Sequence, residues 1–242
     1  MTTATVSEIQ HVTPADLFEV RPFTPHCEVI RAAGDHAVIG VSPGNSYFSA
    51  RRVLDLARWA LAHFERADLV HTDLHVAEMY EASGYPADDA RRKAVKNLRG
   101  VRAKVQAAVG AVDPGGTRLR AHAMSDLRSV PAYRDLHAHL TARLTTDDEF
   151  RTTCEQLVGT FLAGKVTDVT EAQRRVCMAY VCAEAPLFLD TPAILGVPSS
   201  LNCYHQLLPM AELLYAPGAG LRASRNQGHA IVTPAEEVRV VR

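Results

Sequence analysis

The fold is decided by the stretch HAVIGVSPGNSYFSARRVLDLARWALAHFER, residues 36–66. Its first six residues are a mostly apolar run of strand length. The next four, Ser42-Pro-Gly-Asn45, have Pro and Gly where a type II turn requires them. From Ser46 to Arg66, apolar residues recur at the spacing of a helix that buries one face. The stretch therefore predicts a unit of strand, turn and helix.

Similar patterns continue on both sides of this unit. A strand at 69–73 follows the helix after a short loop, which predicts that the two strands are parallel. Extended structure is further predicted at 27–30, 118–123 and 228–233. Helices are predicted at 46–66, 75–82, 87–110, 131–144, 147–164, 170–189 and 205–215. This alternation is typical of an α/β protein, and we expect a three-layer Rossmann-like sandwich with a mainly parallel sheet.

Composition indicates one domain without a global charge signal. The chain has 242 residues, of which 47% are hydrophobic, enough for one substantial core. Residues 1–25 show no sustained period, so we expect a loosely ordered arm before a single domain at 26–242. The formal net charge is −1, so any affinity for nucleic acid must come from a local patch.

The cysteines and the N-terminus indicate a cytoplasmic location. Five cysteines lack a CxxC or a Cys/His metal spacing, so we expect buried free thiols in a reducing compartment and no metal site. No basic segment is followed by an apolar stretch at the N-terminus, and no apolar run reaches the roughly 20 residues of a membrane span. We expect a soluble protein with no membrane partner.

Ser42 is the candidate nucleophile. It ends the first predicted strand, and ligands of open parallel sheets bind beyond the carboxyl ends of strands. The N–H groups and dipole of the following predicted helix would favour an oxyanion there. Pro43 lacks a backbone N–H and no GxSxG motif is present, which disfavours an ordinary α/β-hydrolase. The alternative is that Ser42 only starts the turn while Asn45 or Ser46 caps the helix.

Tyr180 and Glu184 are four residues apart on a predicted helix and share one face. Their surroundings are almost wholly apolar, so a carboxylate there needs a cation or a strong donor. No Lys or Arg lies within one turn of Glu184, which favours a cation that arrives with the substrate, such as an ammonium. The alternative is a structural pair with a distant Arg. Pro186 predicts a kink beside the pair.

The predicted helix 87–110 has a strongly basic face. No acidic residue occurs from 90 to 112, while seven cations do: Arg91, Arg92, Lys93, Lys96, Arg99, Arg102 and Lys104. The stripe that we expect to be buried consists of Val95, Leu98, Val101, Val105 and Val109. A basic face without interleaved acids favours contact with a phosphate backbone, and a merely solvated face is the alternative.

Two of these segments, HAVIGVS at 36–42 and YVCAEAP at 180–186, resemble the signature motifs of the cyclodipeptide synthases, which make diketopiperazines from aminoacyl-tRNAs. The similarity extends over 38–49, 183–188 and 197–200. Asn45, Tyr204 and His205 match the residues that name the Asn-Tyr-His branch of the family. The family is similar in fold to the catalytic domain of class I tyrosyl- and tryptophanyl-tRNA synthetases, but no HIGH-like or KMSKS-like ATP motif is present here.

The resemblance implies a ping-pong reaction of two aminoacyl-tRNAs through an aminoacyl-serine and a dipeptidyl-serine enzyme, without ATP or metal. Ser42 would accept the first aminoacyl group, and Tyr180 and Glu184 would hold its ammonium. The supporting roles, positioning and proton transfer, fall to Asn45, Tyr204 and His205. The seven cations of the basic helix would bind tRNA. We expect a monomer, as in most of the family, with no DNA partner.

The resemblance also implies two side-chain pockets. The first is formed by Val38, Gly40, Val70, Leu157 and Leu187, and its aliphatic side chains favour a small or medium apolar amino acid. The second includes Thr72, Phe188 and Gln206, a mixture that leaves its polarity open. Two other functions stay open: a serine acyltransferase or esterase acting on small esters, and a non-catalytic tRNA-binding module.

Overall fold

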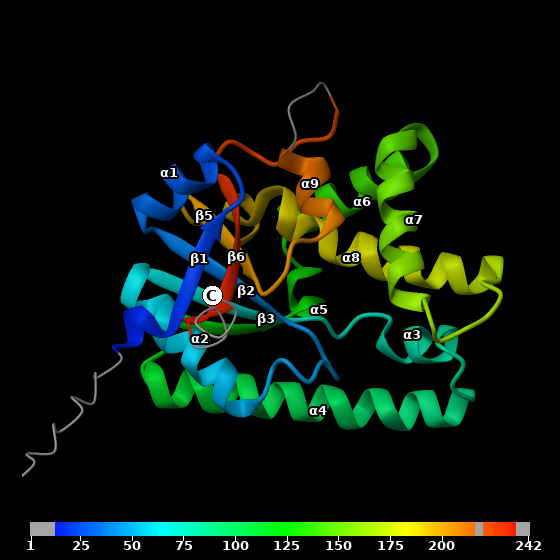
Figure 1. Ribbon diagram of the computed structural model, residues 1–242, viewed down its shortest axis with the longest axis horizontal. Helices are drawn as coiled ribbons and strands as arrows, with labels where there is room; N and C mark the ends of the chain where they lie inside the picture. The colour runs from blue at the N-terminus through cyan, green and yellow to red at the C-terminus, as the bar shows by residue number, and fades with distance from the viewer. Residues whose placement is uncertain (1–12, 216–219, 236–242) are drawn as a thin grey trace, which may run out of the picture.

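The structure is a computed structural model that describes residues 13–215 and 220–235 (Figure 1). Its strands are β1 (Phe18–Pro22), β2 (His36–Val41), β3 (Arg66–His71), β4 (Leu119–Ala123), β5 (Ser200–Tyr204) and β6 (Gln227–Pro234). A short 3-10 helix η1 (Pro14–Leu17) precedes β1. The helices are α1 (Pro25–Ala33), α2 (Ala50–His63), α3 (Val76–Ala82), α4 (Ala87–Val112), α5 (Met124–Leu127), α6 (Pro131–Thr146), α7 (Asp148–Leu162), α8 (Glu171–Leu195) and α9 (Pro209–Tyr215).

The six strands form one sheet in the order β1-β6-β5-β2-β3-β4. Only β1 is antiparallel to its neighbour, and the other pairs are parallel. From β2 the chain adds β3 and β4 on one side, and β5 and β6 then continue the sheet on the other side. The carboxyl ends of β2 and β5 therefore meet at a topological switch point, where α/β sheets bind ligands.

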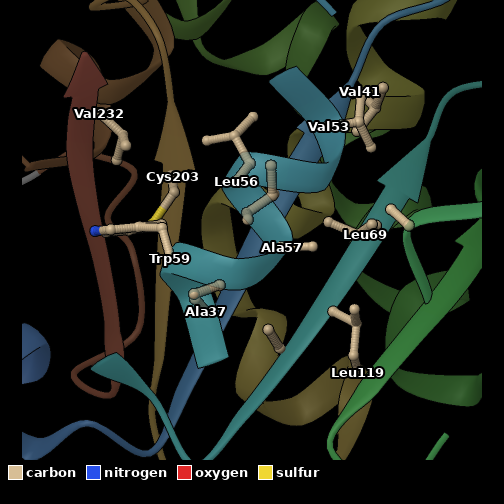
Figure 2. Packing of buried hydrophobic residues seen from close by; sticks show 14 of the residues in the cluster. Ala37, Val41, Val53, Leu56, Ala57, Trp59, Leu69, Leu119, Cys203 and Val232 are labelled. Atoms are coloured by element: carbon tan, nitrogen blue, oxygen red, sulfur yellow. The ribbon is translucent and has the colours of Figure 1, made fainter. Parts of the chain in front are cut away.

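Helices cover both faces of this sheet, which confirms the predicted three-layer α/β fold. On one face, α1, α2 and α4 pack on alternate residues of the strands, with Trp59 and Leu56 of α2 buried against the sheet (Figure 2). On the other face, α5, α6 and α8 cover Val38 and Val70. The residues that continue this second face past the strand ends are Ser42 and Thr72, because side chains alternate along a strand.

Three local predictions are wrong. Phe18–Pro22, expected in a loose arm, forms β1 and pairs with β6. The predicted extended segment 27–30 lies in α1, which Thr24 caps by accepting a hydrogen bond from the Cys27 N–H. The third is Ser200–Tyr204, which forms β5 between β2 and β6 although no strand is predicted there. Residues 1–12 of the expected arm lie outside the described residues.

The turn after β2 is longer than expected. Helix α2 begins at Ala50, not Ser46, and Ser49 caps it by accepting a hydrogen bond from the Arg52 N–H. Neither Asn45 nor Ser46 is the cap. The N-terminus of α2 is thus eight residues from Ser42 in sequence, so the prediction that a helix begins directly after the Ser42 turn and favours an oxyanion there is wrong.

Helix α8 runs through the second face of the molecule. Its non-helical residue is Asp190 (φ −157°, ψ 67°), two residues before Pro192, so the break lies beyond Pro186 and not beside Tyr180 and Glu184 as expected. In length and hydropathy α8 could cross a membrane, but half of its most apolar window is buried inside the protein. Its apolar residues pack with α6, α7 and α9, as in the core helix of a globular domain.

A largely buried polar network ties four neighbouring strands together. Asp68 of β3 accepts hydrogen bonds from His36 of β2 at 2.8 Å and from His122 of β4 at 2.9 Å. The other ring nitrogen of His36 is 2.8 Å from the Ser200 hydroxyl of β5. Burial opposes ionisation of Asp68, but these hydrogen bonds outweigh it and hold its pKa well below the usual range. Ser200, His36 and Asp68 are all buried, so we assign this network a structural role.

Candidate active site

Ser42 lies directly after β2 and is half-buried. The Asn45 N–H donates to the Ser42 carbonyl at 3.4 Å, and Gly44 has φ +75°, as the third residue of a type II turn requires. A Cβ on Gly44 would lie 2.6 Å from the Tyr80 hydroxyl and 2.8 Å from Asn97 Nδ2. These two side chains are hydrogen-bonded to each other at 2.6 Å. The turn that carries the serine is therefore held tightly against α3 and α4.

Tyr204, at the end of β5, places its hydroxyl beside the hydroxyl of Ser42. Its Oη lies 3.3 Å from Ser42 Oγ, and the Asn45 side chain also hydrogen-bonds to it. Burial raises the pKa of Tyr204, against the opposing effect of these two hydrogen bonds, so the phenol is protonated near neutral pH. A protonated phenol beside the serine can donate and accept a proton without ionising.

Tyr180 and Glu184 face the same space from α8, as expected. The Thr72 hydroxyl, just beyond β3, donates to Glu184 Oε1 at 2.5 Å, and the Tyr180 side chain also hydrogen-bonds to this carboxyl. Burial raises the pKa of Glu184, and the two hydrogen bonds oppose that shift. Among the described residues no Lys or Arg forms an ion pair with Glu184. The carboxyl thus has donors that orient it and space for a cation.

His205 lies behind Tyr204. Its ring stacks on Tyr47, with centroids 4.1 Å apart and an interplanar angle of 18°, and its centroid is 4.5 Å from that of Tyr204. The Phe48 ring meets His205 edge-on. Aromatic packing of this kind limits the orientations of Tyr204. The arrangement fits the supporting role that the resemblance implies for His205.

A cavity of about 740 Å³ lies at this site. Ser42, Asn45, Tyr180, Glu184 and Tyr204 all line it. Seven of the predicted pocket residues line it as well: Val38, Gly40, Val70, Thr72, Leu157, Leu187 and Phe188. The eighth, Gln206, is exposed and is not part of this lining, so its assignment to the second pocket stays a prediction.

Several lining residues were not predicted. Met124 and Met210 extend the apolar wall, and Asn202 adds a buried amide from β5. Of these three, only Asn202 carried a usable signal, because it stands two residues before Tyr204, which is a candidate site residue. The two methionines come from α5 and α9, and nothing in their local sequence points to a cavity.

The basic face of α4 is divided between structural and free cations. Five of its seven residues have partners: Arg91 with Asp88, Arg92 with Asp89, Lys93 with Tyr85, Arg102 with Asp73, and Lys104 with the Phe48 carbonyl. Lys93 also lines the mouth of the cavity. Lys96 and Arg99 are exposed and have no partner among the described residues. These two are the best placed to meet a phosphate backbone.

The buried stripe of α4 differs from the prediction. Val95 is 65% exposed, and the fully buried positions are Ala90, Ala94, Val101, Val105 and Ala108. An interface rich in alanine lets α4 lie close to its neighbours. Val95 instead stands beside Lys96 on the outer surface.

Comparison with known proteins gives one consistent result. Residues 18–234 match the family model "Cyclodipeptide synthase". A cyclo(L-tyrosyl-L-tyrosyl) synthase of Mycobacterium tuberculosis is 62% identical over 229 residues, covering 93% of this chain and 79% of that protein. A cyclo(L-leucyl-L-phenylalanyl) synthase of Streptomyces noursei is 36% identical over 211 residues, covering 86% of this chain and 88% of that protein.

A solved structure of a Mycobacterium tuberculosis protein, described as demonstrating that cyclodipeptide synthetases are related to type I tRNA synthetases, agrees with this fold. It superposes with a TM-score of 0.85 and 61% identity, covering 93% of this chain and 98% of that one. The extent of the family match and these identities confirm the expected enzyme class. The chain belongs to the cyclodipeptide synthase family of aminoacyl-tRNA-dependent aminoacyltransferases.

Proposed function

We propose that this enzyme joins two aminoacyl groups, each delivered as an aminoacyl-tRNA, into a cyclic dipeptide through acyl intermediates on Ser42. The observation that carries the proposal is the meeting of three groups in one cavity: the Ser42 and Tyr204 hydroxyls, 3.3 Å apart, and the Glu184 carboxyl. They supply a nucleophile, a proton relay and a seat for an ammonium.

The first half-reaction is transesterification. Ser42 Oγ attacks the ester carbonyl of the first aminoacyl-tRNA, the new Oγ–C bond forms, and the bond to the tRNA ribose oxygen breaks. The serine proton passes through Tyr204 to that leaving oxygen, which departs as a ribose hydroxyl. Glu184 and Tyr180 hold the ammonium of the bound aminoacyl group. Exchange of one ester for another is nearly level in energy, so we propose no need for ATP or a metal.

The second half-reaction forms two amide bonds. The neutral amine of the bound aminoacyl group attacks the ester carbonyl of the second aminoacyl-tRNA; the new C–N bond forms and the bond to the tRNA ribose oxygen breaks. The amine proton passes to that oxygen, which departs as a ribose hydroxyl, and a dipeptidyl-serine remains. The free amine of that dipeptide then attacks the seryl ester, closes the ring and returns the proton to Ser42. A free α-amino group titrates at about 7.7–8.0, so a neutral fraction exists near pH 7 and no strong base is required.

We propose tyrosine as the first amino acid, in place of the small or medium apolar residue predicted from the aliphatic lining. The 62% identity to the cyclo(L-tyrosyl-L-tyrosyl) synthase supports this choice. A cavity of about 740 Å³ also has room for more than a small aliphatic side chain. Lys96 and Arg99 would bind the tRNA backbone, and we place the monomeric enzyme in the cytoplasm, where charged tRNA is available. The five described cysteines are all free and buried, as such a compartment allows.

Purified enzyme with tyrosyl-tRNA tests the proposal. We expect a cyclic dipeptide and, after rapid quenching, a protein mass increased by one tyrosyl group. Ser42→Ala should lose both signals, while Ser46→Ala, an exposed serine of the same loop, should keep them. Cleavage of simple aryl esters without tRNA would instead indicate an esterase. Binding of tRNA with no acyl-enzyme and no product would indicate a non-catalytic module.

A further inference from the structure

Thr72 occupies a fixed place in the cavity wall. It follows β3 directly, is only 5% exposed and lines the cavity. In the parallel pairing of β2 with β3, Val41 lies opposite His71. Ser42 and Thr72 are the next residues after this pair, so they come at the same level, with neighbouring strands about 4.8 Å apart. Thr72 therefore stands beside the proposed nucleophile at the same edge of the sheet.

The residues on either side of Thr72 are anchored by one arginine of α4. Arg102 Nε donates to His71 Nε2 at 3.4 Å, and Arg102 Nη2 donates to the Asp73 carboxyl at 3.1 Å. The same carboxyl accepts from the Ser125 N–H at 2.8 Å and from the Ser125 hydroxyl at 2.7 Å. Contacts on both sides limit the positions that the backbone of Thr72 can take. Its side chain is therefore held in place before any substrate binds.

The Thr72 hydroxyl bonds to both members of the pair on α8. It donates to Glu184 Oε1 at 2.5 Å, and the Tyr180 hydroxyl hydrogen-bonds to both Thr72 and Glu184. An ionised carboxylate accepts about four hydrogen bonds, so these two donors leave positions open for an ammonium. Because Tyr180 is on the same helix as Glu184, only Thr72 of these two donors ties the carboxyl to the sheet that carries Ser42.

We infer that Thr72 is a positioning residue whose hydroxyl orients the Glu184 carboxylate toward the ammonium of the aminoacyl group on Ser42. The family resemblance assigns Thr72 only to a side-chain pocket. A residue that lines a pocket acts by its shape, which valine shares, whereas this role requires the hydroxyl. The inference rests on the proposed function, because it needs Glu184 to hold that ammonium.

A donor to the carboxylate also affects the pH at which Glu184 is ionised. Burial raises the pKa of Glu184, and the hydrogen bonds from Thr72 and Tyr180 oppose that rise, so loss of the Thr72 donor raises the pKa further. The other titratable groups that face Glu184 are tyrosines whose pKa values are raised by burial and that stay neutral near pH 7: Tyr133, Tyr180 and Tyr204. Lys93 and Lys165 also line the cavity, but no ion pair joins either of them to Glu184 in the described part of the chain.

Thr72→Val and Thr72→Ser test this role through the pH profile of kcat/KM for cyclic dipeptide formation. Thr72→Val should lower kcat/KM by about 10- to 100-fold at pH 7 and move the acid limb of the profile to higher pH. Thr72→Ser keeps the hydroxyl and should retain both the rate and the position of the limb. Thr153→Val changes a buried threonine of α7 that is not among the cavity-lining residues, and it should keep the parent profile.

The outcomes separate the inference from the proposed function. A Thr72→Val enzyme with the parent rate and acid limb overturns the role of Thr72, while cyclic dipeptide formation through Ser42 stands. A lower rate with an unmoved acid limb indicates a packing role and also overturns the inference. Absence of any acyl-enzyme in the parent overturns both. If Thr72→Val does not fold, as judged by circular dichroism, Thr72→Ala also lacks the hydroxyl and replaces it in the same comparison.

Discussion

Gly44→Ala tests whether the close fit of the serine turn matters for activity. Gly44 has φ +75°, where a side chain costs about 1–2 kcal/mol. The added Cβ also meets Tyr80 Oη at 2.6 Å and Asn97 Nδ2 at 2.8 Å, and overpacking of this kind costs about 1–3 kcal/mol. The expected loss is therefore about 2–5 kcal/mol in the free energy of unfolding, which lowers Tm by about 2–4 °C per kcal/mol in a chain of this size.

Gly116→Ala is the matched control. Gly116 has φ +60°, but a Cβ there meets nothing within 4 Å, so only the backbone cost of about 1–2 kcal/mol applies. Thermal unfolding should therefore show a larger loss for Gly44→Ala. Activity separates the two further, because a shift of Ser42 by about 1 Å from Tyr204 can cost about 100-fold in rate. The measurement is kcat/KM for cyclic dipeptide formation, and Gly116→Ala should retain the parent value.

A second variant, Tyr80→Phe combined with Gly44→Ala, checks whether the contact between the added Cβ and the Tyr80 hydroxyl causes the loss. Tyr80→Phe removes the nearer of the two clashing atoms, so it should restore part of the activity that Gly44→Ala loses. Equal stability and equal activity in the Gly44→Ala and Gly116→Ala proteins would refute the view that packing against α3 and α4 positions Ser42, the proposed nucleophile.

Three further outcomes follow from the charges. Burial raises the pKa of Glu184, and on the proposed mechanism only its ionised form holds the ammonium. The acid limb of the kcat/KM profile should therefore lie above the pH of an ordinary carboxyl, and Glu184→Gln should lose most activity at every pH. The pKa of Asp68 is lower in the folded than in the unfolded protein, where it is about 3.9. The ionised Asp68 therefore contributes its full stabilisation above that pH, and the contribution declines as the pH falls below it. Urea unfolding of Asp68→Asn should accordingly show a smaller loss of stability between pH 5 and pH 3 than the parent. Lys96→Glu with Arg99→Glu should raise KM for aminoacyl-tRNA and weaken its salt dependence without changing Tm, and an unchanged KM would count against a tRNA-binding role.

The sequence was informative where function depends on local order. The strand, turn and helix around Ser42 were predicted from a 31-residue stretch, and the turn type followed from Pro43 and Gly44. The placement of Tyr180 and Glu184 on one face needed only helical spacing. For such features, the residues that interact are neighbours in the chain, so periodicity and turn chemistry suffice.

Prediction failed where structure depends on distant partners. Strand β1 is five residues long and contains Pro22; it is a strand because it pairs with β6, more than 200 residues away. Segment 27–30 is too short for its alternation to separate strand from helix, and tertiary packing selects the helix. Strand β5 contains an asparagine and a cysteine and no strong β signal, yet it occupies the centre of the sheet between β2 and β6.

The position of Val95 shows a third kind of failure. Val101 and Val105 of the predicted stripe are buried, but the first half of α4 packs through Ala90 and Ala94, and alanines carry little hydrophobic signal.

If activity requires the proposed pair of Ser42 and Tyr204, the pairing of β2 with β5 also sets when the enzyme becomes active during its own synthesis. Ser42 and its hydrogen-bonded partner Tyr204 are 162 residues apart. At about 5–20 residues per second, a ribosome needs roughly 8–30 s to pass from one to the other. During that interval the nascent chain is surrounded by charged tRNA, but its serine has no phenol beside it. On the proposed mechanism, we therefore expect that the enzyme does not draw on the ribosome's own substrates until most of its polypeptide has been made.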